Sequence, residues 1–155
     1  MGLSEQLLTA NNKAMVIDDC CQMIDQQLAA KSGISGMAIK AAFAALRNVK
    51  PGYIPYIVEN LLPQFLTALD PLWNQGIENG DPAAYLVART SDTADAMLGI
   101  TDARVKHTKN SIVKGTYEKF RGSAKKHVEA AVPDLVKIID KYAQVSSVNQ
   151  RISSL

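Results

Sequence analysis

The stretch that decides the fold runs from Tyr53 to Trp73 and reads YIPYIVENLLPQFLTALDPLW. It is the most apolar and aromatic run of the chain. Its apolar residues recur at helical spacing, in the row Ile54, Ile57, Leu61 and Phe65. A helix that is apolar around most of its circumference belongs in a protein core. We therefore expect this stretch to form a buried central helix.

Polar side chains within the stretch argue against a membrane span, although the run is long enough to cross a bilayer. Glu59 and Asp70 carry charge, and Asn60 and Gln64 carry amides. Such groups are costly inside a bilayer. The sequence therefore predicts a protein that is not transmembrane.

The prolines of the stretch stand eight residues apart and predict breaks in its helix. Pro55 suits a first helical turn, where its missing N–H needs no partner. Pro63 removes a mid-helix hydrogen bond and crowds the carbonyl of Glu59, at about 3 kcal/mol. We expect a kink over residues 60–62 and a new short helix beginning at Pro71.

A kink at Pro63 could also open a pocket beside the central helix. This hypothesis predicts an apolar cavity of about 300 Å³ or more with a few convergent polar groups. The candidate pocket residues are Tyr56, Glu59, Asn60, Pro63 and Trp73.

Composition and length predict a single all-α domain. The chain has 155 residues, is dominated by helix formers, and shows no sustained alternation that would mark strands. A chain of this size buries about 70% of its unfolded surface on folding, so it needs no metal or disulfide to stabilise the fold. We expect a compact bundle or orthogonal array of about seven to nine short helices over residues 1–144, with a loose tail at 145–155. Pro133 should end or kink a helix, and Gly33 and Ser35 should separate two others.

The cysteines and the N-terminus favour a cytoplasmic protein without a metal or cofactor. Cys20 and Cys21 are adjacent, so they suit core packing better than a disulfide framework or a metal site. The first ten residues lack the basic start and apolar region of a signal peptide.

No assembled catalytic motif is evident. His107 and His127 have no partner at ligand spacing, and no motif places a serine or cysteine nucleophile beside a histidine and an acid. The residues favour a non-enzymatic protein, and we assign no catalytic residues.

The strongest surface signal is a basic region between residues 104 and 126, in which Glu118 is the single acid. It could be a solvated face, or it could contact an anionic membrane surface or an acidic protein partner. Specific nucleic-acid recognition is disfavoured, because the net charge is +2 and the nearby aromatic residues fall on the core side. The cations are Arg104, Lys106, Lys109, Lys114, Lys119, Arg121, Lys125 and Lys126.

Four phrases of the sequence resemble a bacterial protein family of similar length that has no known function. They are KSGISGMAIKAAFAAL, LLPQFLTALDPLW, TDAR and RGSAKKHVEAAVP, and the similarity runs from about Ser4 to Tyr142. The resemblance implies a soluble, single-domain bacterial protein. It supplies no activity, ligand or catalytic residue.

Three hypotheses follow from the sequence. The first is a non-enzymatic interaction domain that contacts an anionic surface or acidic protein through the basic region. The second is a small-molecule carrier or enzyme with an apolar cavity at the Pro63 kink. The third is a homo-oligomeric structural protein.

Overall fold

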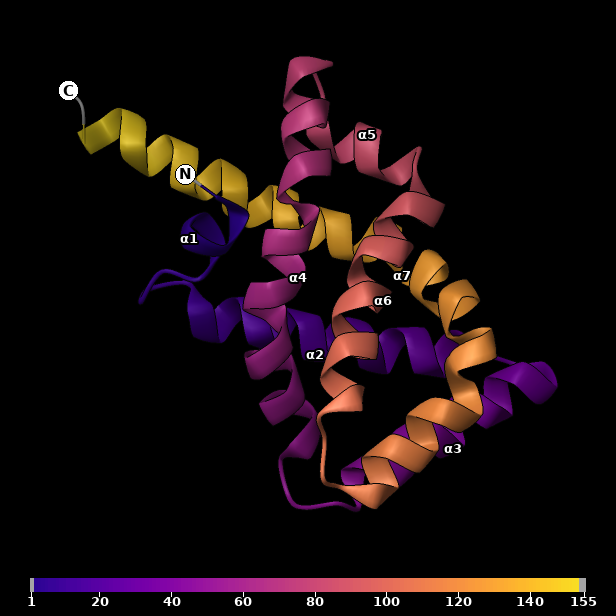
Figure 1. Cartoon of the computed structure of the whole chain (residues 1–155). Coiled ribbons are helices and arrows are strands. Elements are labelled where there is room, and N and C mark those ends of the chain that lie inside the picture. The colour runs from indigo at the N-terminus through magenta and orange to yellow at the C-terminus, as the bar shows by residue number, and fades with distance from the viewer. Residues whose placement is uncertain (1, 154–155) are drawn as a thin grey trace.

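The computed structural model describes the backbone of residues 2–153 and the side chains of residues 2–143. Within this part the chain folds into helices alone, which confirms the all-α prediction (Figure 1). The helices are α1 (Leu3–Leu7), α2 (Lys13–Ala30), α3 (Gly33–Arg47), α4 (Tyr53–Glu78), α5 (Pro82–Val87), α6 (Thr90–Lys106) and α7 (Ser111–Ser153).

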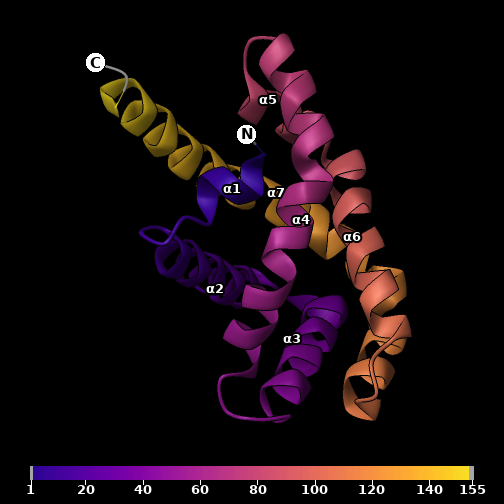
Figure 2. The ribbon, with the colours of Figure 1, turned by 60° about the vertical axis from the view of Figure 1, so that its left-hand side comes forward.

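Helix α4, which contains the predicted central stretch, is the hub of the fold. It contacts α1, α2, α3, α5 and α6. Figure 2 shows it between α2 on one side and α6 on the other. Its buried side chains are Ile54, Leu62, Leu66, Leu69 and Trp73. The apolar pattern of the sequence therefore located the centre of the molecule.

The predicted new helix at Pro71 is wrong, because α4 continues through both Pro63 and Pro71 to Glu78. Each proline removes one backbone hydrogen bond, whereas packing of the surrounding turns stabilises the whole helix. Leu69 and Trp73, which flank Pro71, are both buried in the core. Figure 2 shows α4 bending along its length, as prolines inside a helix predict.

A solid core fills the end of the molecule where α1, α5 and the later part of α7 meet the C-terminal half of α4. Leu3 and Leu7 of α1 and Leu86 of α5 are fully buried there. Asp70, the residue before Pro71, accepts a hydrogen bond of 2.8 Å from the backbone N–H of Leu3. The short α1 is thereby attached to α4 at its first residue.

Helix α7 is 43 residues long and curves around the molecule (Figure 1). Of the two outcomes expected at Pro133, an end or a kink, the helix end does not occur, since α7 continues through this residue. Val132 and Val136, on either side of Pro133, are buried and hold this part of α7 against the core. The predicted loose tail at 145–155 stays a prediction: the α7 backbone extends to Ser153, and side chains beyond residue 143 lie outside the described residues.

Helix α3 begins three residues earlier than expected. Ser32 occupies the N-cap position, and Gly33 has a φ of 74°, which glycine adopts without strain. Ser35 therefore lies inside the first turn and does not cap the helix. Within the described residues, no helix is long and apolar enough to span a membrane.

Candidate functional site

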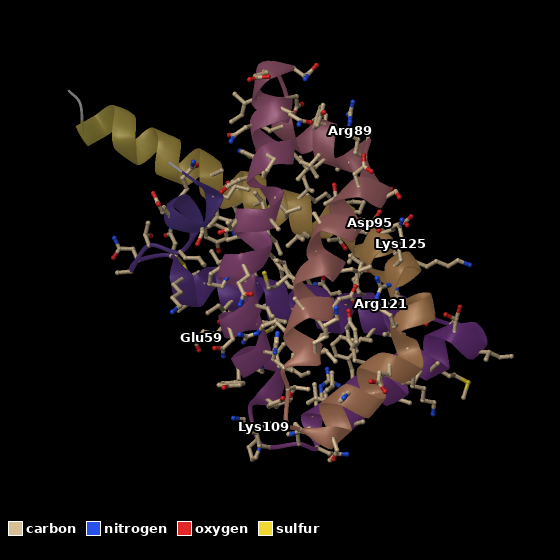
Figure 3. All side chains as sticks on the ribbon, in the orientation of Figure 1. Glu59, Arg89, Asp95, Lys109, Arg121 and Lys125 are labelled. Carbon is tan, nitrogen blue, oxygen red and sulfur yellow. The ribbon has the colours of Figure 1, made fainter. Side chains whose placement is uncertain are left out.

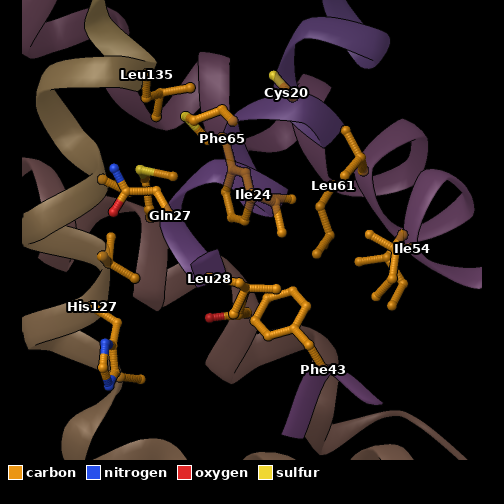
Figure 4. A pocket seen from close by; sticks show the side chains of 18 of the residues that line it. Cys20, Ile24, Gln27, Leu28, Phe43, Ile54, Leu61, Phe65, His127 and Leu135 are labelled. Carbon is orange, nitrogen blue, oxygen red and sulfur yellow. The ribbon is translucent and has the colours of Figure 1, made fainter. Parts of the chain in front are cut away.

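An apolar cavity of about 340 Å³ lies among α2, α3, α4, α6 and α7 (Figure 4). Ile24 and Leu28 of α2, Phe43 of α3, and Leu61 and Phe65 of α4 form much of its wall. Hydrocarbon therefore dominates its lining, and its size falls within the usual range for small-molecule sites. We call it the first cavity.

The first cavity exists because part of the predicted core row of α4 does not meet a close-packed neighbour. Ile57, Leu61 and Phe65 are half-buried, whereas Leu66 and Leu69 are fully buried. The half-buried residues all line the first cavity. The helical spacing correctly placed these side chains inside the molecule, and the arrangement of the other helices made them a cavity wall.

Polar groups stand at the edge of the first cavity. His127 Nε2 lies 3.1 Å from Ser35 Oγ, and Lys31 is also part of the lining. Burial, reinforced by the nearby Lys31 ammonium, lowers the pKa of His127, which favours the neutral imidazole. Gln27 Nε2 donates to Asp134 Oδ2 at 2.7 Å, which links α2 to α7. These groups could contact the polar part of a ligand.

A second cavity of about 550 Å³ adjoins the first. The two share lining side chains from α3, α4, α6 and α7, which makes them neighbouring compartments of one space. The shared residues are Ile39, Phe43, Leu46, Ile57, Leu61, Thr101 and Ala124.

The second cavity is more polar than the first and includes basic groups. Tyr56 and Asn60 line it from α4, and Arg104, His107 and Thr108 line it from the end of α6 and the loop that follows. An amphipathic molecule would therefore meet hydrocarbon in one compartment and cationic or hydroxyl groups in the other.

A hydrogen-bonded network fixes the wall of the second cavity where α6 meets α7. Arg121 contacts Asp102 through two bonds, from Nε at 2.7 Å and from Nη2 at 3.0 Å. Tyr117 OH also donates to Asp102 and lies 2.7 Å from Thr101 Oγ1. The bond from Arg121 lowers the pKa of Asp102, while burial and the bond to Asp102 raise the pKa of Tyr117. Asp102 therefore stays ionised and orients both partners.

The predicted pocket residues are not brought together. Tyr56 and Asn60 line the second cavity, but Glu59, Pro63 and Trp73 line neither cavity. Glu59 is exposed, 3.4 Å from Lys13 Nζ, and Trp73 is buried in the solid core. Both cavities adjoin the N-terminal half of α4. One sequence signal could have indicated the first cavity. Ala124 and Ala131 of α7, which have small side chains, line it opposite the apolar row of α4.

The predicted basic region divides into paired and exposed cations (Figure 3). Arg121 pairs with Asp102, and Lys125 Nζ lies 3.0 Å from Asp95 Oδ1, so these two hold α7 against α6. Arg104 lines the second cavity. The other cations are exposed along α6, α7 and the loop between them: Lys106, Lys109, Lys114, Lys119 and Lys126.

The cysteines have the features of packed thiols. Cys20 is buried, and Cys21 is half-buried beside it. Burial, with smaller effects of Cys21 and Asp19, raises the pKa of Cys20 to about 12. A protonated thiol is a poor nucleophile and a poor metal ligand. Over the described part of the chain, no group of three or more His, Cys, Asp or Glu residues could hold a metal ion.

The contact between Ser35 and His127 was hidden in the sequence, because 92 residues separate them. A nucleophilic serine needs a histidine base that a third group orients. Within residues 2–143 no carboxylate is hydrogen-bonded to His127 or paired with it, so the pair of Ser35 and His127 by itself assigns no reaction. Its position at the edge of the first cavity makes it a candidate for ligand contact.

The sequence of the chain matches a known family over residues 3–143. Residues 3–143 fit the model of a family of unknown function, DUF6918. The chain belongs to this family. No curated protein and no solved structure shows significant similarity to it. The match confirms the resemblance carried by the four sequence phrases, while a bacterial origin stays a prediction. Because the family has no known function, the geometry of the cavities carries the functional argument.

Proposed function

We propose that this protein is a non-enzymatic carrier that binds an amphipathic small molecule with an apolar body and an anionic group. One observation carries the proposal: a hydrocarbon-lined cavity of about 340 Å³ adjoins a second compartment that contains Arg104. This develops the small-molecule hypothesis from the sequence: the α4 residues that contact the ligand include Leu61 and Phe65, on either side of Pro63, and Pro63 itself lines neither cavity.

The first cavity supplies the affinity for the apolar body. A ligand that fills it would remove its own apolar surface from water and also contact Leu61 and Phe43, whose side chains line the cavity. Each methylene buried in this way contributes about 0.8 kcal/mol. The preformed walls keep the ordering cost of binding small.

The second cavity supplies the preference for a ligand that carries an anionic group. Arg104 belongs to its lining and is permanently charged. Asp102, two residues away, already accepts two hydrogen bonds from Arg121. An anionic ligand group beside Arg104 would find a cation there, with Tyr56 and Asn60 as further hydrogen-bonding groups.

The test is calorimetric titration with a series of straight-chain carboxylates of increasing length. Affinity should rise about fourfold for each added methylene, equivalent to about 0.8 kcal/mol, until the chain fills the cavity. The heat-capacity change should be negative, because apolar surface leaves water. Absence of binding at every length, or affinity independent of length, would contradict the proposal.

A matched pair of α7 substitutions locates the site. Ala124→Leu places a larger side chain on the shared wall of both cavities and should abolish binding of the longest carboxylate. Ala130→Leu makes the same change at an exposed position of the same helix and should leave affinity unchanged. Equal effects of the two substitutions would place the binding elsewhere.

A second matched pair tests the charge preference. Arg104→Gln should weaken carboxylate binding about two- to fivefold, a modest effect because Arg104 is exposed. The corresponding straight-chain alcohol should bind the two proteins equally. Lys137→Gln removes one charge from an exposed position of α7 that lines neither cavity, and should change neither affinity.

A further inference from the structure

The first turns of α3 carry the two most exposed large apolar side chains of the described chain. Ile34 is 91% exposed and Met37 is 71% exposed. They stand three residues apart in a helix, so they lie on neighbouring turns of one face. Apolar side chains that gather on a surface in this way mark an interaction site more often than scattered single ones.

These side chains stand on a projecting corner of the molecule. Figure 1 shows the junction of α2 and α3 extending beyond the other helices at the right-hand edge. The same corner borders the first cavity, because Lys31 lines that cavity and Ser35 contacts its lining residue His127. The exposed apolar pair is therefore next to the edge of the proposed ligand site.

Lysines stand before and after the apolar pair in the sequence, and acids are missing from this stretch. Residues 26–58 contain no aspartate or glutamate, and Lys31 and Lys40 flank the apolar pair. Helix α7 contributes Lys126, which precedes the His127 that touches Ser35. The acid just before this range, Asp25, is paired with Arg47 at 2.8 Å. An apolar projection with lysines around it is complementary to a bilayer that carries anionic headgroups.

We propose that this corner, made of Lys31, Ile34, Met37, Lys40 and Lys126, docks on the surface of an anionic membrane. Ile34 and Met37 enter the boundary between headgroups and acyl chains, while the lysines contact the headgroups. The inference goes beyond the proposed carrier function. Docking in this orientation brings the edge of the first cavity to the membrane, where an amphipathic ligand can pass between bilayer and protein.

The experiment is co-sedimentation with vesicles of phosphatidylcholine and with vesicles of equimolar phosphatidylcholine and phosphatidylserine. The protein should bind the mixed vesicles and bind much more weakly to phosphatidylcholine alone. The double substitution of Ile34→Ser and Met37→Ser should weaken binding about tenfold or more, because two apolar side chains no longer leave water. Ile77→Ser, at an apolar position that is 55% exposed on α4, is the matched control and should have no effect.

A charge variant tests the lysines separately. Combining Lys40→Gln with Lys126→Gln should weaken binding to the mixed vesicles, by about fivefold for each lysine, and reduce its salt dependence. Three results would overturn the proposal: no binding to mixed vesicles at low salt, salt-dependent binding unaffected by the Ile34 and Met37 substitutions, or equal loss with Ile77→Ser. A protein that self-associates through this corner, seen as loss of a dimer by light scattering in the double serine variant, would also overturn it.

The docking and carrier proposals can fail independently. The double serine variant should keep its affinity for straight-chain carboxylates in solution, and Ala124→Leu should keep its affinity for mixed vesicles. Loss of both activities in either variant would show that the cavity and the corner are one site, which would contradict a separate docking surface.

Discussion

The two halves of α4 have similar apolar patterns and different surroundings. In the C-terminal half, Leu66, Leu69 and Trp73 are buried in a solid core. In the N-terminal half, Ile57 and Leu61 are half-buried and line both cavities. The comparison teaches that helical periodicity specifies which face turns inward, while the neighbouring helices decide whether that face becomes core or cavity wall.

The neighbours of the two halves explain the difference. At the C-terminal half, Leu7 of α1, Leu86 of α5 and Ile139 of α7 are buried in the core cluster of which α4 is part. At the N-terminal half, small α7 residues, Ala124 and Ala131, face the space between the helices. Larger side chains at these two positions would reduce that space.

The sharpest way to break this comparison is to truncate one leucine in each half of α4. Leu66→Ala should lower the free energy of unfolding by about 3 kcal/mol, because Leu66 is 1% exposed. This value lies within the range of roughly 2–5 kcal/mol for buried leucines. Leu61→Ala should cost less than about 2 kcal/mol, since one side of Leu61 already faces a cavity. Urea unfolding of both variants measures the difference. Equal losses would mean that the N-terminal half of α4 is as tightly packed as the other.

Two glycines probe packing at the backbone. A Cβ at Gly76 of α4 would lie 2.5 Å from Pro82 Cα, so Gly76→Ala must shift the backbone of α5 and should destabilise by about 1–3 kcal/mol. At Gly122 of α7, a Cβ meets no atom within 4 Å. Gly122→Ala should therefore stabilise the helix by about 0.5–1 kcal/mol. Opposite shifts in melting temperature are expected, and a stabilising Gly76→Ala would contradict the close contact of α4 with α5.

The ion pair between Asp102 and Arg121, which joins α6 to α7 beside the second cavity, should contribute little to the free energy of unfolding. Its contribution should be confined to a defined pH range. Asp102→Asn should cost at most about 1 kcal/mol at neutral pH, because the Asp102 side chain is 37% exposed. The pKa of Asp102 is lowered in the folded state, so its contribution is present above the unfolded pKa of about 3.9. It is lost as the pH falls through the lower, folded pKa.

The measurement for Asp102 is urea unfolding of the two proteins from neutral to acidic pH. The gap between wild type and Asp102→Asn should close at the acidic end. Asp92→Asn, at an exposed position earlier in α6, is the control and should show a smaller gap at neutral pH. A gap that widens as the pH falls would show that Asp102 is not stabilised in its ionised form.

The smallest expected effect concerns His127 at the edge of the first cavity. Since burial and Lys31 lower its pKa, Lys31→Gln should raise that pKa, whereas Lys40→Gln should leave it nearly unchanged. NMR titration of the imidazole ring measures both. The lowered pKa also means that the unfolded chain binds a proton more readily, so His127 makes stability decline as the pH falls below about 6.5. If Lys31→Gln left the pKa of His127 unchanged, the Lys31 ammonium would not act on His127 at the edge of the first cavity.

The sequence located α4 and its inward face because a long apolar row at helical spacing has few alternatives in water. It predicted a helix start at Pro71 that does not occur, and it allowed a helix end at Pro133, where α7 continues. The rule that proline disrupts a helix considers only the free-energy cost at the proline itself. Burial of the nearby Trp73 and Val136 offsets that cost through contacts with distant segments. Tyr56 and Asn60 proved to line a cavity, but Glu59 and Trp73, on other faces of the same helix, did not.

By itself, the sequence determined the helical class and the central helix, because periodicity and residue type are local properties. The tertiary structure alone decided that α3 and α7 leave a cavity beside α4, that His127 meets Ser35, and that Ile34 is left exposed. Each of these depends on where segments far apart in the chain come to lie. Packing of the whole molecule fixes those positions, and no pattern within one segment specifies them.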